Sequence, residues 1–198
     1  MAARLPRLAK RPFPDVKAEK LMRIVVTRLD DKRYGSVIER DGVSFRLNGP
    51  GFMKALPHDL AHYVVESALG LPHGFWGCVA EGAVPAGMTF ISGRQKPKAK
   101  ERASAVLKAH KSELSEAEML VAVFESGIAQ GIAGNWPAMR ASLKRLQTPG
   151  RANPHNVGPD DVANVCQTWS EVLSQWQALR PGESLSLDWP RKRARRRQ

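Results

Sequence analysis

One stretch near the centre of the chain decides the fold: Pro57-His58-Asp59-Leu60-Ala61-His62-Tyr63-Val64-Val65-Glu66. It continues through Leu69-Gly70-Leu71 to His73-Gly74-Phe75-Trp76-Gly77. Its apolar residues recur at the spacing of one helix face, Pro57 suits a first helical turn, and Gly70 suits a helix end. At about 100° per residue, His58, His62 and Glu66 form a row along the edge of the apolar face. We predict a helix that packs on a sheet and holds this row at the rim of a groove.

Histidines four residues apart lie on one helix face, close enough to bind one metal ion. The spacing resembles that of the HExxH zinc hydrolases, in which the glutamate acts as general base, and Asp59 stands at that position here. We therefore predict a divalent metal ion, zinc first, on His58 and His62, with His73 or a solvent molecule completing the shell. Glu66 lies about 12 Å from His58 along the helix axis, too far to share the ion, so we expect it to orient His62. If hydrolysis occurs, Asp59 is the predicted base, and zinc-bound water would attack an ester, amide or phosphoester bond.

The histidine row also has a purely structural interpretation, because histidines commonly stand at the boundary of an amphipathic helix. The sequence therefore leaves open whether the chain is an enzyme. Cys78 follows His73 closely enough to suggest a Cys–His nucleophile pair, although its aromatic neighbours favour a buried structural thiol. No nucleotide cofactor is expected, because residues 49–51 lack the Lys-Ser or Lys-Thr that follows the glycines of a P-loop.

The segments around the histidine helix predict an α+β domain. Residues 22–29, 34–40 and 43–47 read as strands, and Asp41-Gly42 marks a hairpin, so we expect an antiparallel meander of about three strands. A further strand is possible at 88–91, and 184–189 alternates like an edge strand. Helices are predicted over 74–83 and 96–111, from Ser115 to Gly134, after Asn135, and from Pro159 to Arg180. Ser115 and Glu118 have the spacing of a capping box, which predicts a helix start.

Residues 21–190 are assigned to this single α+β domain. Its first part, 21–93, holds the β-meander and the histidine helix, and its second part, 94–190, is mainly helical. Residues 1–20 are predicted to be a basic flexible arm and residues 191–198 a basic disordered tail.

The basic segments suggest an alternative function. The chain of 198 residues carries a formal net charge of +12, concentrated in residues 1–20, 94–111 and 191–198. Such runs neutralise phosphates without reading a base sequence, so the alternative is a non-enzymatic nucleic-acid-associated or adaptor protein. A solvated terminus would explain the tail equally well. The tail residues that would contact nucleic acid are Arg191, Lys192, Arg193, Arg195, Arg196 and Arg197.

Cysteine content and hydropathy predict the compartment. Cys78 and Cys166 are the only cysteines, which fits reduced thiols rather than a disulfide framework. The basic N-terminus lacks the apolar run of a signal peptide, and the longest apolar run, interrupted by Glu125, is too short to span a bilayer. We therefore expect a cytoplasmic protein with no membrane partner, and the oligomeric state stays open.

The order of these motifs resembles that of a family of small uncharacterised bacterial proteins. The resemblance covers roughly residues 22–82: hairpin strands, then His58-Asp59-Leu60-x-His62-Tyr63-x-Val65-Glu66, then Gly70-Leu71 and Gly74-Phe75-Trp76-Gly77. That family has no established activity, so the resemblance implies a domain unit and a cytoplasmic bacterial origin, and it implies no reaction. The HD-domain phosphohydrolases share only the pair His58-Asp59. They need an earlier metal-binding histidine, and His58 is the first histidine of this chain.

Overall fold

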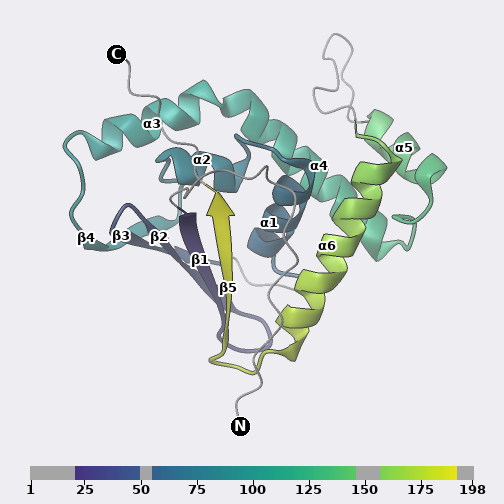
Figure 1. Ribbon diagram of the computed structural model, residues 1–198, viewed down its shortest axis with the longest axis horizontal. Coiled ribbons are helices and arrows are strands. Elements are labelled where there is room, and N and C mark those ends of the chain that lie inside the picture. Colours follow the sequence, from purple (N-terminus) through teal and green to yellow (C-terminus); the bar gives the residue numbers. More distant parts are fainter. Residues whose placement is uncertain (1–20, 50–54, 146–156, 191–198) are drawn as a thin grey trace.

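The computed structural model describes residues 21–49, 55–145 and 157–190. Within these ranges the chain forms one five-stranded antiparallel sheet and six helices, which confirms the predicted α+β class (Figure 1). None of the helices in the described ranges is long and apolar enough to cross a bilayer. The predicted arm, residues 1–20, and the predicted tail, residues 191–198, lie outside the described residues.

The sheet contains the predicted meander and one further strand at each edge. The strand order is β4-β3-β2-β1-β5. Asp41 and Gly42 have φ angles of 53° and 72°, and a two-residue type I′ hairpin turn requires such positive values at both positions. The edge strand predicted near the C-terminus is confirmed, and it pairs antiparallel with the first strand. The strands are β1 (Leu21–Arg28), β2 (Tyr34–Arg40), β3 (Val43–Asn48), β4 (Met88–Gly93) and β5 (Ser184–Pro190).

The helices follow the predicted order, and several ends are where local chemistry puts them. Gly70 ends the histidine helix in the left-handed conformation, with φ 65°. Asn135 accepts a hydrogen bond from the Ala138 N–H at 3.2 Å, as expected of a helix cap. The helices are α1 (His58–Leu69), α2 (Phe75–Glu81), α3 (Ala99–Ala109), α4 (Lys111–Ala129), α5 (Trp136–Arg145) and α6 (Pro159–Ala178).

Both predicted ends of α4 are wrong. The helix begins at Lys111, so Ser115 lies inside it and does not cap it. The capping-box spacing misled because the Glu118 carboxylate lies beside the His58 and His62 rings. At the other end, Gly131 has a φ of 69°, and its N–H bonds to the carbonyl of Ile128, which stops the helix before Gly134.

Helix α1 lies at the centre of the fold (Figure 1). One side of it faces the sheet, where Asp59 accepts a hydrogen bond from Ser36 of β2 and Tyr63 contacts Trp189 of β5. Its other sides contact α2, α4 and α6. Its apolar residues Leu60, Val64 and Val65 are completely buried. His58 and His62 lie where α1 meets α4, with one side of the pair exposed, whereas Glu66 faces the start of α2. Amphipathic spacing identified the edge of the apolar face but could not show that α4 packs beside it.

Candidate metal centre

His58 and His62 lie one turn apart on α1, and their rings converge. The two Nε2 atoms are 3.2 Å apart, and the ring planes meet at 88°. The first turn of the helix is held in place by Trp76 of α2, whose indole N–H donates to the carbonyl of Asp59 at 2.9 Å. The edge-to-face arrangement brings one ring nitrogen from each histidine to the same point.

Glu118 of α4 brings a third donor atom to this point. Its Oε2 lies 3.2 Å from Nε2 of His62 and 3.6 Å from Nε2 of His58. In a tetrahedral zinc site with bonds of about 2.0–2.1 Å, neighbouring donor atoms are about 3.3–3.4 Å apart. The three observed separations, 3.2–3.6 Å, bracket this value, so the three donor atoms fit three corners of a tetrahedron around one zinc ion.

A buried carboxylate orients His62. Nδ1 of His62 lies 2.9 Å from Oε1 of Glu66, whose side chain is completely buried. Glu66 also accepts hydrogen bonds from the backbone N–H groups of Phe75 at 2.7 Å and Trp76 at 3.0 Å. The contact between Glu66 and His62 keeps a proton on Nδ1 of His62 and leaves its Nε2 free to bind an ion. This is the usual arrangement behind a metal-ligating histidine.

Glu125 of α4 lies behind the other ring in a similar way. Its Oε1 is 3.7 Å from Nδ1 of His58, and its side chain is almost fully buried. In each histidine Nε2 therefore faces the other ring and Glu118, whereas Nδ1 faces a buried carboxylate. That carboxylate is Glu66 for His62 and Glu125 for His58.

The carboxylates control the protonation of the two rings. Glu118 and then Glu125 raise the pKa of His58 to about 9. Burial is the largest single influence on His62 and lowers its pKa, but Glu118 and Glu66 together outweigh it and raise the pKa to about 9. Conversely, the two rings hold the pKa of Glu118 well below its usual range. A metal ion entering this cluster would have to displace the protons on Nε2.

The cluster is open to solvent on one side. The side chains of His58 and Glu118 are 44% and 55% exposed, whereas that of His62 is 3% exposed. The exposed side offers a path by which an ion and a further ligand could reach the donor atoms.

Two residues predicted for the site lie elsewhere. His73, in the turn between α1 and α2, is grouped with His110 and Glu113 and not with His58 and His62. The carboxylate of Asp59 faces the sheet, where Ser36 of β2 donates to it at 3.3 Å, and burial raises its pKa. Neighbouring helix positions point about 100° apart, which explains why Asp59 turns away from the side that carries the rings.

Sequence reasoning missed Glu118 and Glu125, because both come from a helix that follows α1 by about fifty residues. The sequence pattern assigns Glu118 to a capping box and marks Glu125 only as an interruption in an apolar run. A single acidic residue inside such a run was the available signal, because an acidic side chain is rarely buried unless it is paired.

The fold and the cluster define an α+β protein whose described residues include a His/Glu group able to hold a metal ion. No known protein family, curated protein or solved structure gives a significant match to the chain. The resemblance to the uncharacterised bacterial family therefore stays a prediction. The six basic residues predicted to contact nucleic acid, at positions 191–193 and 195–197, lie outside the described residues.

Proposed function

We propose that the chain binds a divalent metal ion, with zinc preferred, through His58, His62 and Glu118. The observation that carries this proposal is the spacing of the three donor atoms, 3.2–3.6 Å from one another. Two imidazoles and one carboxylate form a common zinc ligand set, and catalytic zinc sites keep the fourth position open. The exposed side of the cluster supports an open position of this kind.

Glu66 and Glu125 would stabilise the bound state through the rings that they contact. Glu66 fixes the tautomer of His62, and its own position is fixed by two backbone N–H groups. A divalent ion held there would supply Lewis-acid chemistry, which makes hydrolysis of an ester, amide or phosphoester bond the reaction class that we propose. From its present place beside Ser36, Asp59 would have to turn away from the sheet to act as the base.

The test is the metal content of tag-free protein, purified without chelators and reloaded with zinc. We expect His58→Ala and His62→Ala each to lower the content by about one ion per chain, and Glu118→Gln to weaken binding. Glu116→Gln is the matched control, because Glu116 lies on the same helix outside the donor group. An unchanged metal content in folded His62→Ala protein would refute the proposal. Hydrolysis is tested by comparing the zinc-loaded wild type with His62→Ala against ester, amide and phosphoester substrates.

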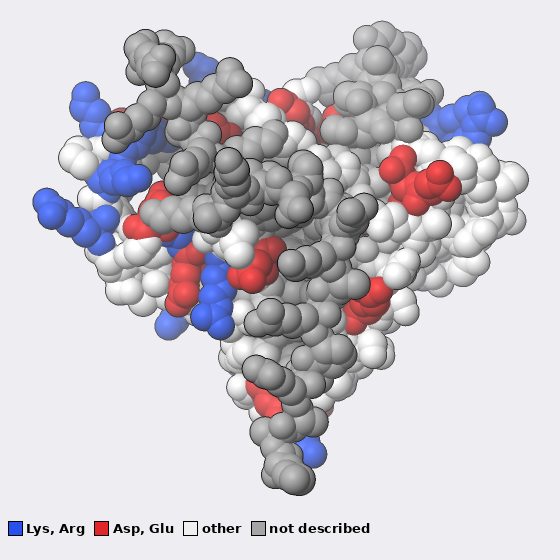
Figure 2. Space-filling view, viewed as in Figure 1, with Lys and Arg blue, Asp and Glu red and all other residues white. Residues whose placement is uncertain are grey.

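A second candidate function is binding of nucleic acid, and the surface of α3 favours it. Lys98, which precedes this helix, and Lys100, Arg102 and Lys108 within it are all exposed. Figure 2 shows Lys and Arg side chains gathered on the side of the molecule where α3 lies. Binding through such a surface would be independent of base sequence and would weaken steeply with added salt. Electrophoretic mobility shifts of short DNA and RNA at two salt concentrations would test this candidate.

A further inference from the structure

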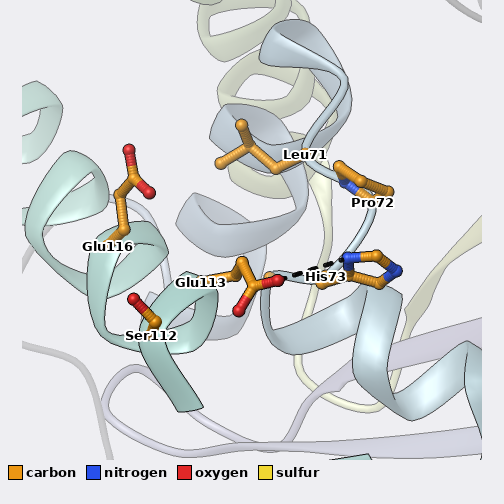
Figure 3. Close-up of a pocket in the computed structure, with 7 residues that line it drawn as sticks. Leu71, Pro72, His73, Ser112, Glu113 and Glu116 are labelled. Carbon is orange, nitrogen blue, oxygen red and sulfur yellow. Dashed lines mark ion pairs between the residues drawn. The ribbon is translucent and has the colours of Figure 1, made fainter. Parts of the chain in front are cut away.

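A second group of metal-ligating side chains lies apart from the first. His73 comes from the turn between α1 and α2, His110 from the junction of α3 and α4, and Glu113 from the first turn of α4. No residue of this group belongs to the group formed by His58, His62 and Glu118. Figure 3 shows His73 and Glu113 facing each other from opposite segments.

The two rings present the same nitrogen to the same carboxylate oxygen. Nδ1 of His110 is 3.3 Å and Nδ1 of His73 is 3.7 Å from Oε1 of Glu113. The rings are stacked, with centroids 3.8 Å apart and planes 17° from parallel. Both Nδ1 atoms therefore lie at one edge of the stack, next to a carboxylate. Since each lone pair lies in its ring plane and the two planes are nearly parallel, at least one ring would have to rotate out of the stack before both Nδ1 atoms could bind one ion.

The surroundings repeat a feature of the first cluster. On the far side of its ring, Nε2 of His110 lies 3.2 Å from Oε2 of Glu81 on α2. This contact leaves Nδ1 as the ligating atom, as the contact with Glu66 leaves Nε2 of His62. The backbone at His73 is also fixed, because its carbonyl accepts a hydrogen bond from the Cys78 thiol at 3.3 Å.

An ion has a route to this group. A pocket of about 320 Å³ opens beside it, and His73 and Glu113 form part of its wall (Figure 3). The side chains of His73 and Glu113 are 33% and 43% exposed, whereas that of His110 is 17% exposed. The pocket supplies room for solvent to complete the coordination of an ion.

We propose that His73, His110 and Glu113 form a second divalent-metal site, separate from the one on α1. Imidazole and carboxylate donors suit zinc, cobalt and nickel. Because the three ligands come from three segments, an ion here would tie the α1–α2 turn to the start of α4 and so stabilise the fold. The competing explanation is a purely structural cluster in which His110 lies between Glu81 and Glu113 without a metal.

The experiment is titration of the metal-free full-length protein with zinc, followed by measurement of bound metal. We expect about two ions per chain in the wild type, about one in His73→Ala or His110→Ala, and about one in His62→Ala. The double variant His62→Ala/His110→Ala should bind none. Glu101 is exposed on α3 and belongs to neither donor group, so Glu101→Gln should keep both ions.

The outcomes separate this proposal from the first one. If folded His110→Ala and His73→Ala bind as much zinc as the wild type, the second site is refuted and the purely structural explanation holds. If His62→Ala binds as much zinc as the wild type while His73→Ala and His110→Ala each bind about one ion fewer, the site on α1 is refuted and the second site stands. Glu113→Gln guards against variants that fail to fold, because its side chain is partly exposed; it should weaken the second site at least about tenfold. Unweakened binding in folded Glu113→Gln would also overturn the proposal.

Discussion

Glu66→Gln should destabilise the protein and weaken its metal site together. The carboxylate of Glu66 is completely buried and accepts three hydrogen bonds, from the N–H groups of Phe75 and Trp76 and from Nδ1 of His62. Glutamine has nearly the same shape, but it has one acceptor oxygen and one donor amide. Its oxygen can take the place of Oε1, which serves Phe75 and His62, and its amide then faces the N–H of Trp76.

The expected loss of stability follows from these contacts. A buried donor without an acceptor costs about 1–3 kcal/mol, and two remaining bonds that lose their charged partner weaken by about 1 kcal/mol each. Glutamine avoids the desolvation of a buried charge, which offsets part of this loss. We therefore expect a decrease of about 3 kcal/mol in the free energy of unfolding, or about 6–12 °C in Tm for a chain of this size.

The assay is urea denaturation of the metal-free protein, followed by tryptophan fluorescence, so that bound metal does not add to stability. Glu101→Gln is the matched control, because Glu101 is exposed on α3 and its change should stay within about 0.5 kcal/mol. The zinc affinity of Glu66→Gln should fall about 10–100-fold. An unfolding midpoint equal to that of the wild type would refute this account of the buried network. A destabilised variant with unchanged zinc affinity would refute the orienting role alone.

Three further predictions test separate parts of the structure. Gly74→Ala would place a Cβ 2.3 Å from Cδ of Glu66, so it should destabilise by at least about 2 kcal/mol in thermal unfolding, whereas Gly134→Ala, which has open space, should stay within about 0.5 kcal/mol. Burial raises the pKa of the Cys78 thiol to about 12, so Ellman's reagent should label at most Cys166 until urea unfolds the chain. Rapid labelling of Cys78 in the native state would revive the nucleophile hypothesis. Deletion of residues 191–198 should weaken binding to nonspecific DNA at low salt, and equal binding would show that the tail is not the anchor.

The parts of the fold that the sequence predicted well depend on local chemistry. Helix α1 ends at Gly70 because the left-handed conformation there suits glycine, and the hairpin follows from the positive φ angles of Asp41 and Gly42. The alternation of β5 predicts a strand but not its pairing with β1, because alternation carries no information about a partner about 160 residues away. The same limit explains why α4 was not expected beside the histidines.

In the candidate site, too, the contacts within one helix could be predicted and those between helices could not. The pairing of His58 with His62 follows from helix geometry alone, and so does the contact of His62 with Glu66. The third donor, Glu118, comes from tertiary packing, and short distance along the chain wrongly favoured His73 in its place. The turn between α1 and α2 carries His73 away from the row and toward α4, where it stacks on His110.

Burying the carboxylates of Glu66 and Glu125 costs free energy, and this cost helps to choose between a metal site and a purely structural histidine row. Glu66 is buried where α1 meets the start of α2, Glu125 is buried on α4, and each lies next to one of the two histidines. A buried ionic network is commonly no more stable than well-packed apolar residues of similar volume, so stability alone gives little reason for two such carboxylates. Metal binding does give one, because a carboxylate behind each ring sets its tautomer and strengthens it as a ligand. Departures from an apolar core are expected at functional sites, so the two buried carboxylates favour a binding site over a boundary of an amphipathic helix.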